Sequence, residues 1–318
     1  MPSKFTRLSR KGIRTLSIQD RQHKVKVEHF SNIRAGSFLE RLPEQLKGTE
    51  WSDFCHALAR AFRERKPVIV MLGGHVVKVG VTPFLIDWIG RGLISAVVFN
   101  GSTAIHDAEI ALWGQTSEDV EAGLADGTFG MVDETPAAFA EALEISSVED
   151  MGLGEALGVV LERRDAPHAG SSMTAACHAA GIPLTVHVGV GTDTIHQHPD
   201  IDGARLGAAS MADFEVFCQQ ISLLQPGSVV INFGSAVLLP EVFLKALTTA
   251  RNLGHECGGL ITADFSMIPQ YRPAVNVVGR PTRTGGGRGF SFTGYHELLI
   301  PLLFDCVEEL IREPEVQV

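Results

Sequence analysis

A histidine and two carboxylates lie together near the start of one predicted helix in this 318-residue chain. They are His106, Asp107 and Glu109, and they follow the polar, glycine-containing stretch NGST. An imidazole beside carboxylates at the carboxyl end of a strand is a candidate for proton transfer. Acidic residues are also common in the first turn of a helix, where they complement its dipole. The same three residues therefore have a purely structural alternative.

One lysine lies close to the end of the first predicted strand. Lys78 occurs in the segment LGGHVVKVG, six residues after Leu72. In a desolvated loop its side chain would act as a free amine, able to take a proton or to form an imine. The alternative is an ordinary solvent-exposed lysine.

The densest group of polar residues is the segment HVGVGTDTIHQHPDIDG. It contains His187, Asp193, His196, His198, Asp200 and Asp202. Three interpretations are open: a cofactor or substrate site, a divalent metal site built on the histidines, and turn residues that satisfy the loop backbone. Histidines in a loop are a weaker metal signature than His-Glu-x-x-His on a helix.

Apolar runs that alternate with helical patterns must position these residues. Six runs read as strands, at 68–72, 95–100, 183–188, 228–233, 258–265 and 274–278. Their uniform rather than alternating hydrophobicity fits strands that are covered on both faces. Helical patterns between them are typical of an α/β protein with a doubly wound, mostly parallel sheet of the Rossmann type. We expect a basic N-terminal arm over 1–48 and one domain over 49–318, with a helical insertion at about 116–172.

In a doubly wound sheet, ligands bind where loops gather at the carboxyl ends of the strands. The pattern places five loops there, at 73–80, 100–107, 189–198, 234–240 and 264–271. Their small residues would let backbone N–H groups approach a phosphate, although no G-x-G-x-x-G follows the first strand. The candidate residues named above fall in or next to three of these loops.

Composition and charge narrow the classes of partner. Lys and Arg number 27 and Asp and Glu 37, so the net charge is −10, which argues against nucleic acid and fits a small cationic ligand. No apolar run approaches the ~20 residues that a membrane span requires. The five cysteines form no CxxC pair, and the basic N-terminus lacks the apolar stretch of a secretory signal. We expect a cytoplasmic protein.

From about residue 67 onward the chain resembles the deoxyhypusine synthase-like NAD-binding superfamily. The resemblance lies in GGHVVKVGVTPFLIDWIGRG, SAVVFNGSTAIHDAEIAL, IPLTVHVGVGTD, SVVINFGSAVLLPEVFLKAL and LLIPLLF. It implies a deoxyhypusine synthase-like fold, NAD as cofactor and a homotetramer. The cofactor-binding candidates that it implies are Gly73, Gly74, His75, Asn100, Gly101, Ser102, Asp193, Gly234 and Ser235.

Two departures from deoxyhypusine synthase argue against that reaction. Its imine-forming Lys lies in a Trp-Gly-Lys element, and the comparable stretch here is NVVGRP. Its Lys-His-His loop is replaced by GSAVLLPE. The HDAE element is also similar to the NAD-dependent ornithine cyclodeaminase part of arginine dihydrolase fusions, and to proteins described as lysine-ketoglutarate reductase/saccharopine dehydrogenase.

The sequence thus predicts an NAD-dependent enzyme that oxidises a small amine or amino acid to an imine. Asp107 and Glu109 would hold the cationic amine, His106 would move protons, and Lys78 would be the available amine base. Two other functions are open. One is a metal-dependent hydrolase that uses His187, His196 and His198, and the other is a non-catalytic nucleotide-binding homologue.

Overall fold

The computed structural model describes residues 3–34 and 36–312, and these form two compact units. The first unit is Met1–Thr49 and the second is Glu50–Val318. In the first unit, two 3₁₀ turns (Ile18–Asp20 and Val27–His29) bury no residue. The short helix α1 (Phe38–Arg41) begins with a capping box between Ser37 and Glu40.

A six-stranded, entirely parallel sheet forms the centre of the second unit. Its strand order is β3-β2-β1-β4-β5-β6. The strands are β1 (Val68–Leu72), β2 (Ala96–Asn100), β3 (Leu184–His187), β4 (Val229–Phe233), β5 (Ile261–Ser266) and β6 (Arg288–Thr293). The predicted doubly wound α/β fold is confirmed, and the strand order reverses between β1 and β4.

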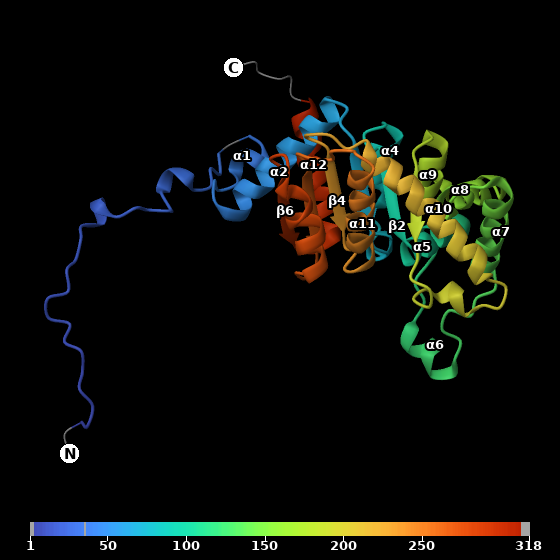
Figure 1. Ribbon diagram of the computed structural model, residues 1–318, viewed down its shortest axis with the longest axis horizontal. Helices are drawn as coiled ribbons and strands as arrows, with labels where there is room; N and C mark the ends of the chain where they lie inside the picture. The colour runs from blue at the N-terminus through green and yellow to red at the C-terminus, as the bar shows by residue number, and fades with distance from the viewer. Residues whose placement is uncertain (1–2, 35, 313–318) are drawn as a thin grey trace. The chain divides into compact units, whose positions relative to one another are not determined.

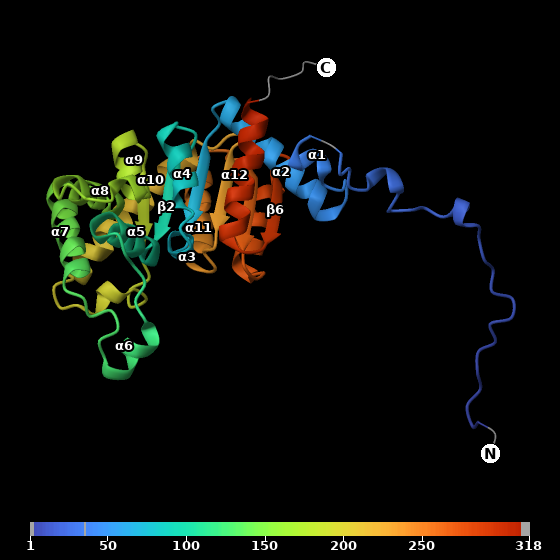
Figure 2. The ribbon, with the colours of Figure 1, turned by 180° about the vertical axis from the view of Figure 1, so that it is seen from behind.

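Helices cover both faces of this sheet. On one face lie α10 (Gly203–Ser222) and α11 (Leu238–Asn252), whose Phe217 and Phe243 join a core cluster with Met71 and Val230 (Figure 1). On the opposite face lie α4 (Thr82–Gly90) and α12 (His296–Arg312), where the rings of Trp88 and Phe304 stack (Figure 2). The remaining helices are α2 (Leu46–Arg63), α3 (His75–Lys78), α5 (Gly101–Trp113), α6 (Val120–Asp126), α7 (Glu134–Glu149), α8 (Leu153–Arg163) and α9 (Met173–Ala180). No helix among the described residues has both the length and the apolar character needed to cross a membrane.

The sixth strand lies where the sequence did not predict one. The expected strand over 274–278 is wrong, because Pro273–Gly279 forms a π-helix. Strand β6 instead begins inside the glycine-rich run, at Arg288. A Cβ at Gly289 would overlap the carbonyl of Val278, so only glycine lets β6 pass this close to the π-helix.

Two buried aspartates join helices to the rest of the domain. Asp213 of α10 accepts hydrogen bonds from the backbone N–H groups of Gly154 and Val186, at 3.0 and 2.8 Å. Burial raises the pKa of Asp213 to about 7, although these hydrogen bonds act in the opposite direction. The carboxyl group thus connects α10 to both α8 and β3.

Asp107 of α5 is the second of these aspartates, and it is fully buried. It accepts from the N–H groups of Met173 and Thr174 and from the Ser172 hydroxyl, at 2.9, 3.0 and 2.6 Å. Its carboxyl group therefore lies at the N-terminus of α9, and burial raises its pKa, although these hydrogen bonds act in the opposite direction. The structure gives Asp107 a structural role in place of the predicted contact with a substrate amine.

We predict a distinct pH dependence of stability from Asp213. Because its pKa is about 7 in the folded protein and about 3.9 in an unfolded chain, the folded state binds the proton more tightly. The protonated Asp213 therefore contributes fully to the free energy of unfolding below about pH 4. This contribution, at most about 4 kcal/mol, is lost as the pH rises to about 7. Asp213→Asn should remove this part of the slope in urea unfolding curves. Equal slopes for variant and wild type would contradict the assignment.

We also predict that Asp107→Ala lowers the free energy of unfolding by about 2–4 kcal/mol, because three buried donors lose their acceptor. Asp202→Ala is the matched control, since Asp202 caps α10 in an exposed position. It should cost only about 1 kcal/mol. Chemical denaturation of both variants provides the measurement, and a smaller loss for Asp107→Ala than for Asp202→Ala would contradict the structural role.

Candidate functional site

Three loops meet at glycines at the carboxyl edge of the sheet. A Cβ added to Gly74, after β1, would overlap Ser102 Oγ at the start of α5 and lie 3.0 Å from His106 Cδ2. A Cβ added to Gly101 would overlap the carboxylate of Asp193, in the loop after β3. These side chains can pack directly on the glycine backbone because Gly74 and Gly101 have no side chain of their own. His106 and Asp193 are thus brought to the same edge.

The loop after β4 joins the same edge. A Cβ at Gly73 would lie 2.8 Å from the carbonyl oxygen of Gly234, and the N–H of Gly73 donates to Phe233. Gly234 has a φ of +73° and lies against the ring of His296. The Ser235 hydroxyl accepts from the N–H of Leu239 and so supports the start of α11.

A cavity of about 550 Å³ opens beside this junction. Helix α5 forms one wall, and the segment that contains α6, together with the start of α7, forms another. The lining residues are Lys78, Ser102, Ile105, His106, Glu109, Trp113, Gln115, Thr116, Ser117, Glu118, Val120, Phe129, Gly130, Val132, Glu134, Thr135, Thr192, Asp193 and Thr194. Of the predicted site residues, the cavity brings together Lys78, Ser102, His106, Glu109 and Asp193.

A chain of hydrogen bonds links His106 to Glu109 in the cavity wall. The Thr116 hydroxyl donates to Glu109 Oε2. That hydroxyl must then accept its 2.7 Å hydrogen bond with His106, so His106 Nδ1 carries the proton. In the neutral ring, Nε2 is left with the lone pair. The arrangement is an imidazole base oriented by a carboxylate through one hydroxyl.

Glu109 is held as a carboxylate. Burial alone would raise its pKa, but the nearby His106 ring and the hydrogen bonds from the Thr116 and Thr135 hydroxyls together outweigh burial and place the pKa below its usual value. The Thr135 hydroxyl donates to Glu109 Oε1 at 2.9 Å. Its charge is therefore available to stabilise a protonated His106, whose Nδ1 lies 3.8 Å from Glu109 Oε2.

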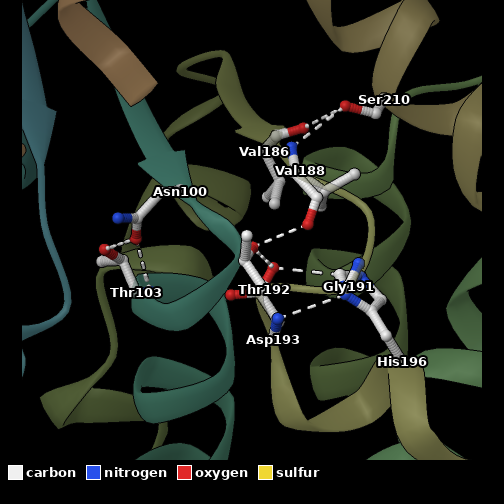
Figure 3. Close-up of polar contacts among 10 residues, drawn as sticks. Asn100, Thr103, Val186, Val188, Gly191, Thr192, Asp193, His196 and Ser210 are labelled. Atoms are coloured by element: carbon white, nitrogen blue, oxygen red, sulfur yellow. Dashed lines mark hydrogen bonds and ion pairs between the residues drawn. The ribbon is translucent and has the colours of Figure 1, made fainter. Parts of the chain in front are cut away.

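Asp193 and the following 3₁₀ turn (Thr194–Gln197) form the third side of the site. Figure 3 shows His196 Nδ1 accepting hydrogen bonds from the N–H groups of Gly191 and Asp193, at 3.1 and 3.2 Å. The Thr192 hydroxyl donates to the Gly189 carbonyl at 2.6 Å and lies 3.3 Å from Asp193 Oδ2. Burial raises the pKa of Asp193, against the influence of His196 and Thr192.

Other predicted residues have different surroundings. Lys78 lines the cavity but is exposed, so the desolvation expected for an amine base is absent. Asn100 caps α5 through the N–H of Thr103. The ring of His75 lies 5.9 Å from that of His296. Asp107 faces α9 and does not line the cavity.

The insertion contributes cavity residues that the sequence did not predict, among them Thr116, Glu118 and Glu134. Gly130 connects this insertion to the loop after β3, because its carbonyl oxygen accepts a hydrogen bond from His198 Nε2 at 2.8 Å. Its N–H donates to Glu118, within the insertion. The sequence holds one signal for Thr116, the glycine two positions before it. Gly114 ends α5 with a φ of +68°, and a glycine is typical of such a helix end.

The three histidines that could have been metal ligands, His187 of β3 and His196 and His198 of the loop after it, do not form a metal site. His187 is buried against Phe217 and Thr185, and burial lowers its pKa to about 3. The ring of His198 contacts Gly130, and that of His196 contacts its own loop. Within residues 3–34 and 36–312, no group of three His, Cys, Asp or Glu side chains is arranged to hold a metal ion. The metal-dependent hydrolase therefore has no ligand set in the described part of the chain.

A second polar cluster lies outside the cavity, at the carboxyl ends of β4 and β5. Asn232 Nδ2 donates to Asp264 Oδ1 at 2.7 Å, and the Ser266 hydroxyl donates to the same carboxyl group. Burial raises the pKa of Asp264. Asp264 and Ser266 lie in the 264–271 loop that the sequence analysis placed at this edge, but neither they nor Asn232, which lies within an apolar strand, were selected as site residues.

No protein-family model and no curated protein sequence matches the chain. Solved structures do match it. A LOR/SDH protein of Methanococcus maripaludis S2 is 16% identical with a TM-score of 0.53, and the match covers 84% of this chain and 71% of that one. A protein assigned as a deoxyhypusine synthase of Entamoeba histolytica is 11% identical with a TM-score of 0.52, over 86% of this chain and 92% of that one.

A third similar structure is AgrE in a ternary complex with ornithine and NAD⁺. It is 14% identical with a TM-score of 0.50, and the match covers 88% of this chain. The chain spans about a third of the length of AgrE, 34%. At these identities the similarity shows the fold. The predicted deoxyhypusine synthase-like, Rossmann-type fold is thereby confirmed.

Proposed function

We propose that this protein binds NAD and uses it to oxidise a small amine or amino acid to an imine. The observation that carries the proposal is the hydrogen-bonded chain from His106 through Thr116 to Glu109 in the wall of the cavity. Removing a hydride from a carbon next to nitrogen requires a neutral amine, so a base must first take a proton from the ammonium form. His106 Nε2 is that base.

The charge of the cavity favours a cationic substrate. Glu109, Glu118, Glu134 and Asp193 line it, against the single lysine Lys78. Of the two carboxylates predicted to hold the substrate amine, only Glu109 lines the cavity, so we assign this role to Glu109 alone. Because Lys78 is exposed at the cavity wall, we assign it to the carboxylate of an amino-acid substrate rather than to proton abstraction.

The loops fit a dinucleotide in two respects. The N-terminus of α5 carries two small residues, Gly101 and Ser102, and Gly101 lies against Asp193 of the loop after β3. Backbone N–H groups at the N-terminus of a helix bind phosphate oxygens. Asp193 supplies a carboxylate of the kind that accepts from ribose hydroxyls. When bound, NAD would accept the hydride from the substrate carbon.

The chain's own residues would handle the proton and the water. One proton leaves the substrate ammonium for His106 Nε2, and Glu109 stabilises the resulting imidazolium through Thr116. Water or a second amine then adds to the substrate imine, and His106 serves again as acid or base for that addition. Addition of water would release ammonium and leave a carbonyl compound.

A non-catalytic nucleotide-binding protein is the second candidate. One feature favours it, the absence of an imine-forming lysine from the NVVGRP stretch. This stretch lies in the π-helix and directly after it. For the same reason we do not propose deoxyhypusine synthase activity. The homotetramer and the cytoplasmic location stay predictions from the sequence.

NAD should raise the thermal midpoint of the protein. A ligand at one hundred times its Kd stabilises the native state by about 2.7 kcal/mol, which corresponds to about 5 °C for a protein of this size. Thermal unfolding with millimolar NAD, and with AMP at the same concentration as a control, provides the test. An unchanged midpoint with NAD would contradict the proposed function.

Glu109→Gln should lower turnover about 10²–10³-fold, because Gln carries no charge to stabilise protonated His106. The NAD-induced thermal shift should persist, since Glu109 is assigned to proton transfer and the amine. The exposed Glu121→Gln is the control. The measurement is NADH formation across a panel of amines and basic amino acids. Bound NAD without turnover by the wild type would favour the non-catalytic candidate.

A further inference from the structure

His196 carries a buried hydrogen-bonding atom that none of the roles above explains. Its side chain is only 6% exposed. Its Nε2 atom is buried and has no hydrogen-bond partner among the described residues. Leaving such a group unsatisfied is costly, so a native structure that keeps one points to a missing partner.

The contacts of the ring decide which nitrogen carries the proton. Nδ1 accepts from two backbone N–H groups, those of Gly191 and Asp193, and therefore cannot itself bear a hydrogen. Nε2 must then be an N–H donor. The two nitrogens have separate tasks: Nδ1 holds the loop in shape, and Nε2 presents a donor without an acceptor.

The nearest candidate acceptor lies just out of reach. Nε2 is 3.9 Å from Asp193 Oδ2, too far for a direct hydrogen bond. An oxygen about 2.8 Å from both atoms would bridge them with an angle of about 90° at that oxygen. Such an oxygen must accept from Nε2–H and donate to the carboxylate. A hydroxyl group does both, whereas a phosphate or ether oxygen has no proton to donate.

Asp193 places this gap at the proposed cofactor site. It lines the cavity, and its carboxylate lies against Gly101 at the start of α5. The Thr192 hydroxyl also lies near Asp193 Oδ2, but it donates to the Gly189 carbonyl at the shorter distance. Asp193 Oδ2 therefore has a lone pair for a further hydrogen bond.

We propose that His196 and Asp193 form a hydroxyl-recognition pair, in which His196 Nε2–H donates to, and Asp193 accepts from, a ribose hydroxyl of the ligand. This inference rests on the proposed function, which makes that ligand NAD. It assigns to His196 a part in ligand selectivity that is separate from its part in the shape of the loop.

Two substitutions separate these parts. His196→Asn places a side-chain oxygen near the position of Nδ1, so it keeps the acceptor for the loop and loses the distal donor. His196→Gln places an amide N–H near the position of Nε2, so it keeps the donor and loses the loop acceptor. Each variant is measured for NAD affinity by calorimetry and for thermal midpoint without ligand.

His196→Asn should weaken NAD binding about tenfold while the thermal midpoint stays close to that of the wild type. His196→Gln should bind NAD within about threefold of the wild type but unfold at a lower temperature. If affinity falls only in the variant that loses stability, or in neither variant, the pair does not recognise the ligand. Absence of NAD binding by the wild type would overturn both this inference and the proposed function, whereas normal binding by His196→Asn would overturn this inference alone.

Discussion

The direct packing of the Ser102 and Asp193 side chains on the backbone of Gly74 and Gly101 is the constraint on which the site depends. Neither position has room for a Cβ, because Ser102 and the Asp193 carboxylate occupy that space. This contact joins the loop after β1, the start of α5 and the loop after β3. It brings His106 and Asp193, which are far apart in the sequence, to one edge of the sheet. The cavity opens beside this point, and both His106 and Asp193 line it.

Carboxylates near this edge divide into two kinds according to what surrounds them. Asp107 and Asp213 are buried among backbone N–H groups and connect helices to the domain. Glu109 and Asp193 instead line the cavity. Hydroxyl groups and imidazoles are their main partners, and such groups can also contact a ligand. Residue type alone does not separate the two kinds, since Asp107 and Glu109 lie two positions apart on the same helix.

The sequence was sufficient for the fold because a parallel sheet has a strong signature. Five of the six strands follow from uniformly apolar runs, such as VIVML for β1. Strand β6 could not be found this way, because RGFSFT alternates and follows a glycine run that reads as a loop. The segment 274–278 has a strand-like composition, but Pro273 and packing against β5 and β6 favour a π-helix.

The site was predictable in part. The rule that loops at the carboxyl edge bind ligands selected His106, Glu109 and Asp193, which the cavity brings together. It could not show that Asp107 faces α9, since that depends on where α9 packs. It also could not find Thr116, whose importance comes only from the turn that places it between His106 and Glu109. A crystal structure of the protein grown with NAD tests the account most directly. The account predicts the dinucleotide along the loops after β1, β2 and β3, with its nicotinamide facing the cavity of His106; NAD bound elsewhere, with that cavity open only to solvent, would contradict it.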